Sequence, residues 1–189
     1  MLITHEREKL ANAIVFFAKN TNYCGITKLF KLLYFLDFVH FRQTGRTVTG
    51  LTYVTWPKGP APNELWHEIK SGPSADLAKA ASFVEPDPSE ESHLTKIVPR
   101  SPFDTKYFTR RELRILELLA EIYRDARAPD MVEVTHLRGK PWDVTVKQHG
   151  MNAPIDFMLA LDGTDKDQLS QEEIIERLKD RDQTRKAFS

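Results

Sequence analysis

The stretch "TKLFKLLYFLDFVHFRQTG", from Thr27 to Gly45, decides how this chain of 189 residues folds. Its apolar residues recur at helical spacing on almost every side. This pattern predicts a helix that begins near Ile26 and ends near Thr44, with Gly45 as its C-cap. A helix that is apolar nearly all round is either buried centrally or in contact with another molecule. We therefore expect this helix at the centre of the fold.

Two polar side chains, Asp37 and His40, interrupt the apolar part of this stretch. They are three positions apart, so they can contact each other on a helix. Such a pair could bind a metal or act as an acid/base dyad, but the other histidines show none of the spacings typical of metal ligands. A buried carboxylate needs a partner, which His40 or a backbone donor would supply. We interpret the two residues as a structural polar pair and expect Asp37→Ala to cost roughly 1–3 kcal/mol of stability.

The expected solvent side of the same helix holds Lys28, Lys31 and Arg42 and is interrupted by Phe35 and Phe38. Aromatic side chains are enriched among the residues that dominate protein–protein binding. Both phenylalanines are therefore candidate partner-binding residues.

The composition argues against several functional classes. The chain holds 27 lysine and arginine residues against 27 aspartate and glutamate residues, so it lacks the basic footprint of nucleic-acid binding. Neither a P-loop nor a GxGxxG motif occurs, and no pattern indicates a cofactor. The lone cysteine, Cys24, cannot form an internal disulfide and suits a reducing compartment. The N-terminus has no signal-peptide pattern, and the apolar stretches fall short of the roughly 18 residues that span a bilayer, so we expect a cytoplasmic protein.

The remaining pattern predicts a mainly α, α+β fold, a single-domain helical bundle with a small antiparallel β-sheet or hairpin inserted between helices. We expect a strand at 48–56, bulged at Gly50, to pair with a second strand at 94–98. Further helices are expected at 5–19, at 63–72, as a short piece before an acidic loop in 73–91, after a capping box of Thr109 and Glu112, across 129–150 with a break around Gly139 and Pro141, and after Ser170. Residues 1–165 form the expected domain, and 166–189 a charged helix that belongs to it or frays from it.

Two tryptophans, Trp56 and Trp66, flank the rigid turn "PKGPAP", whose prolines argue against a helix interior or a central strand. Aromatic residues beside a stiff loop are typical of binding hot spots, whereas buried tryptophans would instead fill the core beneath the loop. In either case we expect Lys58 and Gly59 at the tip of the turn to be exposed. The candidate partner-binding residues here are Tyr53, Trp56, Lys58, Gly59, Pro60 and Trp66.

A third constellation is "THLRGKPWDVT", in which His136 and Trp142 bracket a Gly–Lys–Pro turn. One interpretation is a helix break whose tryptophan closes the core. The other is an aromatic platform on which a ligand stacks. We include both residues among the candidates for binding.

Together these stretches resemble the Panacea domain family, which includes SocA-like antitoxins and proteins described as GepA-type and phage-associated. The resemblance covers about residues 5–160, and the block around Lys28 to His40 is its specific part. The residues that match the family pattern are Lys28, Lys31, Leu32, Leu33, Tyr34, Phe35, Asp37, His40, Gly45, Thr49, Gly50, Leu51, Tyr53, Gly59, Pro60, Leu65, His136, Pro141 and Trp142.

The resemblance implies a non-enzymatic antitoxin without cofactors, encoded beside a protein toxin that it neutralises by direct binding, as a hetero-oligomer with the toxin or also as a homo-oligomer. Two alternatives stay open. The chain could be an adaptor that delivers the toxin to a protease, with a recognition tail in the charged residues 170–189. It could also be an enzyme that uses Asp37, His40 and His136, which requires these three residues to converge on one pocket.

Overall fold

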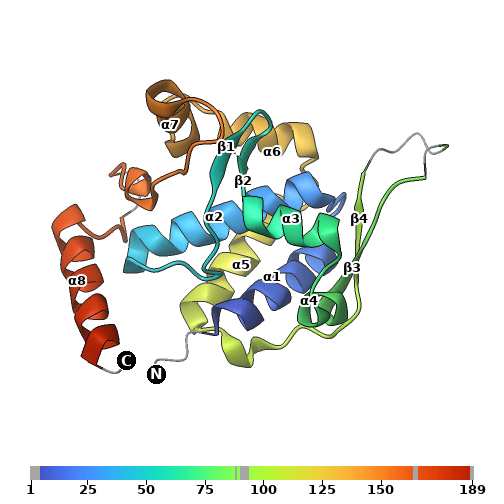
Figure 1. Ribbon diagram of the computed structural model, residues 1–189, viewed down its shortest axis with the longest axis horizontal. Coiled ribbons are helices and arrows are strands. Elements are labelled where there is room, and N and C mark those ends of the chain that lie inside the picture. Colours follow the sequence, from blue (N-terminus) through green and yellow to red (C-terminus); the bar gives the residue numbers. More distant parts are fainter. Residues whose placement is uncertain (1–4, 88, 90–93, 164–165, 188–189) are drawn as a thin grey trace.

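The computed structural model describes residues 5–87, 89, 94–163 and 166–187 of the chain. The fold is mostly helical, with two small pairs of antiparallel strands, as the sequence predicts (Figure 1). In chain order its elements are α1 (Glu6–Asn20), α2 (Ile26–Thr44), β1 (Val54–Trp56), β2 (Gly59–Ala61), α3 (Asn63–Ser71), α4 (Ala75–Ala80), β3 (Ala81–Val84), β4 (Lys96–Pro99), η1 (Thr105–Tyr107), α5 (Arg110–Ile122), α6 (Ala128–Thr135), α7 (Pro141–His149), η2 (Phe157–Ala160) and α8 (Gln171–Ala187), where η marks a 3-10 helix.

Helix α2 lies at the centre of the molecule, which confirms the prediction from its apolar pattern. It packs against α1, α5, α6, β2 and η2, and Figure 1 shows α2 crossing the middle of the fold. The leucines of the helix are fully buried: Leu29, Leu32, Leu33 and Leu36. The helix ends at Gly45, which adopts the left-handed conformation (φ 72°) that caps helices.

The strand pairing differs from the prediction. We expected 48–56 to pair with 94–98, but β1 begins only at Val54 and pairs with β2, while β4 pairs with β3. The physical reason is that the backbone N–H groups of Val48 and Thr49 donate to the side chain of Asp37 instead of to a neighbouring strand. Gly50 follows with a positive φ of 71°, which turns the chain out of the extended conformation.

The turn "PKGPAP" contains β2, although its prolines argued against a central strand. Pro60 lies opposite Thr55 in the ladder of β1 and β2. The other side of β1 bonds to residues 152–155, but β2 is an edge strand, where a missing N–H is tolerated. The expectation that Gly59 is exposed is wrong, because α6 covers it: a Cβ on Gly59 would lie 2.6 Å from Thr135 Oγ1. Lys58 is exposed as expected.

Several local predictions for the C-terminal half are confirmed. Thr109 and Glu112 form the capping box at the start of α5, and the break between α6 and α7 falls around Gly139 and Pro141. Helix α7 begins at Pro141, because a proline is tolerated at the first helical position, where its missing N–H has no intrahelical partner.

Helix α8 lies at one side of the molecule (Figure 1). Its contacts with the body lie near its first turns, where Ile174 is buried close to Gly45 and Arg177 Nη1 donates to Thr44 O over 3.4 Å. The expected fraying at 188–189 and part of the expected acidic loop, 88 and 90–93, lie outside the described residues. Within the described part of the chain, no helix has both the length and the apolar character needed to cross a membrane.

Candidate functional site

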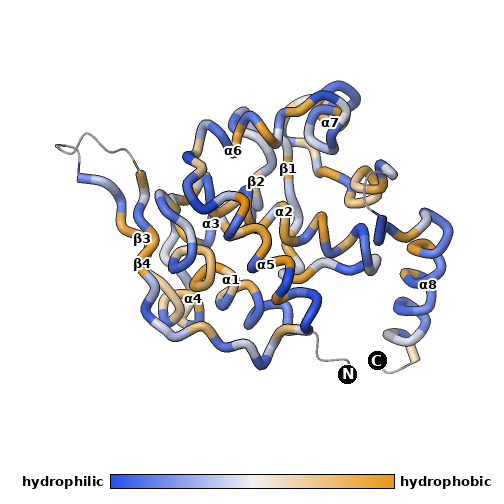
Figure 2. The backbone as a smooth tube through the Cα atoms, turned by 180° about the vertical axis from the view of Figure 1, so that it is seen from behind, coloured by the Kyte–Doolittle hydropathy of each residue, from blue (hydrophilic) through white to orange (hydrophobic). Residues whose placement is uncertain are grey.

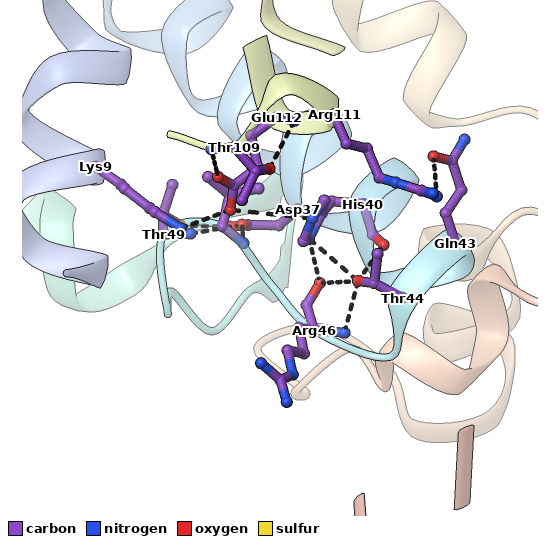
Figure 3. Close-up of polar contacts among 11 residues, drawn as sticks. Lys9, Asp37, His40, Gln43, Thr44, Arg46, Thr49, Thr109, Arg111 and Glu112 are labelled. Atoms are coloured by element: carbon purple, nitrogen blue, oxygen red, sulfur yellow. Dashed lines mark hydrogen bonds and ion pairs between the residues drawn. The ribbon is translucent and has the colours of Figure 1, made fainter. Parts of the chain in front are cut away.

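Asp37 anchors the segment that follows α2 (Figure 3). Its carboxylate is completely buried and accepts four hydrogen bonds, from Val48 N at 2.7 Å, from Thr49 N at 2.9 Å, from Thr49 Oγ1 at 2.5 Å and from Tyr53 Oη at 2.7 Å. Burial raises the pKa of Asp37 to about 6, although all four donors favour the ionised form and oppose this rise. The side chain thereby fixes the path of residues 48–53 against the central helix.

His40 anchors a different part of the chain. Its Nδ1 lies 2.7 Å from Arg46 O, and because a carbonyl only accepts, Nδ1 carries the proton of this hydrogen bond. Its Nε2 lies 3.9 Å from Glu112 Oε1. Burial lowers the pKa of His40, which favours the neutral imidazole. Asp37 and His40 therefore bind separate partners, and the contact that we expected between the two side chains is absent from the described structure (Figure 3).

Glu112 joins three helices next to His40. Its side chain is buried at the start of α5, where Oε1 accepts a hydrogen bond from Lys9 Nζ of α1 at 2.6 Å and Oε2 accepts one from Thr109 N at 2.7 Å. The same carboxylate faces His40 of α2. The capping residue that the sequence identifies is thus also the polar link between α1, α2 and α5.

Two buried lysines of α2 have a similar role, which sequence reasoning missed by assigning them to the polar face. Lys28 Nζ donates to three backbone carbonyls, Asn22 O at 2.7 Å, Arg124 O at 3.1 Å and Ala126 O at 2.7 Å. Lys31 Nζ donates to Pro60 O of β2 at 2.6 Å, and burial lowers the pKa of Lys31 to about 7. The signal that could have revealed both is that they lie in a helix that is apolar on almost every side.

The predicted aromatic residues of α2 divide between core and surface. Phe38 and Tyr53 are buried and belong to an aromatic cluster, in which the Phe38 ring lies 4.2 Å from that of Tyr34 and 4.4 Å from that of Phe157. Phe35 is half-buried and stacks on Tyr123 of α5 at 5.3 Å. Of these candidates, only Phe35 therefore offers part of its ring to a partner.

The two other predicted constellations meet in space. Trp56 packs edge-on against Trp66 at 5.4 Å, and its backbone carbonyl accepts a hydrogen bond from Trp142 Nε1 at 3.1 Å. The His136 ring stacks on Trp142 at 3.8 Å. Burial and the nearby charge of Lys31 lower the pKa of His136, whose Nε2 is buried without a hydrogen-bond partner among the described residues. The turn "PKGPAP" and the break between α6 and α7 thus form one aromatic surface, in which Trp56, Trp66 and His136 are half-buried and Trp142 belongs to the buried core.

The three residues of the enzyme alternative have separate surroundings. Asp37 bonds to residues 48–53 and His40 to Arg46, whereas His136 lies against Trp142. Among the residues that the structure describes, no three or more His, Cys, Asp and Glu side chains gather closely enough to hold a metal ion.

Comparison with known families identifies the family of this chain. The sequence matches the family described as "Antitoxin SocA-like, Panacea domain" over residues 29–143, so the chain belongs to this family. The matched range contains Asp37, His40 and the aromatic surface, together with β1 to β4. Comparisons with curated proteins and with solved structures give no match.

Proposed function

We propose that this chain is an antitoxin that neutralises a protein toxin by binding it directly. The observation that carries the proposal is the family match over residues 29–143, because this family is described as antitoxin SocA-like. The partner we propose is the product of the neighbouring open reading frame. Neutralisation by direct binding needs a docking surface on this chain and no chemistry.

The architecture supports a binding role. The polar side chains of α2 that looked like candidates for chemistry are bonded within the protein, Asp37 to four donors and His40 to the carbonyl of Arg46. Meanwhile several large apolar side chains are exposed: Tyr23, Val84, Val98, Leu118, Ile122, Leu137, Met151 and Ile175. Exposed apolar groups of this size suit contacts with another protein.

We place the toxin on the half-buried residues of the aromatic surface, Trp56, Trp66 and His136, with Lys58 at its edge. Half-buried tryptophans supported by a rigid turn resemble the anchors that dominate binding energy. The buried candidates Phe38, Tyr53, Gly59, Pro60 and Trp142 would act by holding this surface in shape.

The test is co-expression with the neighbouring open reading frame under an inducible promoter. Growth arrest by the neighbour alone, relief by this chain, and co-purification of the pair would support the proposal. Lys58→Glu should weaken rescue and co-purification, whereas Lys79→Glu, an equal charge change at an exposed site on α4, should leave both intact. A harmless neighbour, or no complex despite soluble expression of both proteins, would contradict direct neutralisation.

One observation favours a second candidate, the protease adaptor. Helix α8 is polar nearly all round and almost entirely exposed beyond Ile174, so little of it serves the core. Such a helix could be recognised by a protease that degrades the toxin. Truncation after residue 169 would abolish rescue by an adaptor that uses this helix, but not rescue by an antitoxin that binds through the aromatic surface.

A further inference from the structure

The outer face of α5 exposes two large apolar side chains to solvent. Leu118 is 50% exposed and Ile122 is 59% exposed. They are four positions apart, so they lie side by side on the same face of the helix. The inner face holds the core residues Ile115, Leu116 and Leu119. Figure 2 shows the molecule from behind, with α5 near the centre of the view.

The charges around these two residues are ordered along the helix. Arg110 and Arg114 lie in the N-terminal half of α5, and Glu117 and Glu121 in the C-terminal half, all four exposed. This order opposes the helix macrodipole, which favours acidic residues near the N-terminus and basic residues near the C-terminus. The spacing also sets Arg110 against Arg114 and Glu117 against Glu121 as like-charged neighbours, which destabilises an isolated helix.

These four charged side chains are not bonded within the described part of the chain, although the opposite charges of Arg114 and Glu117, three positions apart, attract each other. In the described structure none of them makes a side-chain hydrogen bond or an ion pair, whereas their neighbour Arg111 bonds to Gln43. An arrangement that is unfavourable for the helix alone becomes favourable when an oppositely ordered set of charges lies beside it.

We propose that the outer face of α5 is a dimerisation surface for a second copy of this chain. Two copies of α5 related by a two-fold axis near Leu118 run antiparallel. The basic half of one helix then lies beside the acidic half of the other. Arg114 of each copy comes within reach of Glu121 of its partner, and the exposed apolar side chains of the two copies cover each other. A two-fold interface requires such self-complementarity, since the same patch serves both subunits.

The expected dimer is weak. Two large apolar side chains per copy make a patch smaller than standard interfaces, so we expect a dissociation constant above about 1 µM. Because the flanking pairs are ionic and exposed, dimerisation should weaken as the salt concentration rises. This inference does not depend on the proposed antitoxin function, and its test needs no toxin.

The experiment is sedimentation equilibrium of the purified full chain at concentrations from about 5 to about 500 µM. The wild type should pass from monomer to dimer. Each single reversal, Arg114→Glu or Glu121→Arg, should shift the midpoint at least about tenfold towards higher concentration, because each places like charges across the axis. The double reversal, which combines Arg114→Glu with Glu121→Arg, should restore dimerisation. The control variant Lys79→Glu should sediment like the wild type.

Circular dichroism of each variant shows whether α5 remains folded, so a lost dimer is distinguished from a lost fold. A wild type that stays monomeric at every concentration would overturn the proposal. The same holds if the single reversals dimerise like the wild type, or if the folded double reversal stays monomeric. If the wild type is monomeric and both single reversals lose toxin binding to the same extent, this face of α5 would instead be the site that binds the toxin.

Discussion

Replacing Asp37 tests whether this residue holds the fold together or instead acts as a metal ligand or an acid/base residue. In Asp37→Ala the backbone N–H groups of Val48 and Thr49 lose their acceptor in a buried position. The hydroxyl hydrogens of Thr49 and Tyr53 can rotate, but the two N–H groups cannot. At about 1–3 kcal/mol for each stranded group, we expect a loss of about 2–6 kcal/mol. This exceeds the roughly 1–3 kcal/mol expected from the sequence, which assumed a single partner.

The matched control is Asp37→Asn, which keeps the shape and replaces the charge. Its amide oxygen can accept from both backbone N–H groups, and its amide group can donate to the two hydroxyl oxygens. Because burial raises the pKa of Asp37 from its ordinary value of 3.8 to about 6, ionising this carboxyl group costs more free energy in the folded protein than in the unfolded chain. We therefore expect the asparagine variant to be at least as stable as the wild type at pH 7.

The pH dependence follows from the same pKa. A folded-state pKa above the unfolded value means that the folded chain binds the proton more tightly. The resulting stabilisation is complete below pH 3.8 and is lost as the pH rises through about 6. About two pKa units correspond to about 3 kcal/mol. The wild type should therefore lose most of this stabilisation relative to Asp37→Asn between pH 4 and pH 7.

The assay is urea unfolding of the wild type and both variants across this pH range, with the transition midpoint and slope recorded for each. Rescue from the toxin should fall only where the folded fraction falls. Asp37→Ala with an unchanged midpoint but no rescue would refute the structural assignment, because the carboxylate would then act in function rather than in the fold.

Three further predictions concern other contacts. Because burial lowers the pKa of Lys31, the unfolded chain binds more protons than the folded chain above pH 7. The free energy of unfolding of the wild type should therefore rise above pH 7 by up to about 1.4 kcal/mol per pH unit. The free energy of unfolding of Lys31→Met should lack this rise. Gly59→Ala should cost about 1–3 kcal/mol more than Gly139→Ala in thermal unfolding, because both have positive φ but only the former meets Thr135. Thr109→Ala should cost about 1 kcal/mol by urea unfolding, and no loss would show that the α5 cap is not stabilising.

The sequence predicts those parts of the fold that depend on local periodicity. The all-round apolar pattern places α2 at the centre, and the spacing of Thr109 and Glu112 identifies the start of α5. Gly139 and Pro141 likewise mark the break between α6 and α7. In each case the deciding groups lie within a few positions of one another, so their interaction can be inferred without knowing the fold.

The strand pairing could not be predicted because it depends on contacts between distant segments. The residues 48 and 49 have the composition of a strand, but Asp37 takes up their N–H groups. The true partner of β4 is the short segment 81–84, which follows directly from a helix and has little strand signal of its own.

The candidate site was predicted only in part for the same reason. Asp37 and His40 were identified as buried polar residues, but their partners come from loops whose positions the sequence does not give. Lys28 and Lys31 were missed because a helical projection treats lysine as a surface residue. Their long side chains instead reach backbone carbonyls of other segments.

The most direct test of the central claim is the amount of toxin in cells that this chain has rescued. An epitope-tagged toxin would be measured by immunoblot, and the fraction bound to this chain by co-purification. Direct neutralisation predicts that the toxin persists at the level seen with an inactive toxin variant and is found in a complex with this chain. Rescue in which the toxin disappears would contradict direct neutralisation. If the toxin level then returns when proteases are removed, the result would support an adaptor.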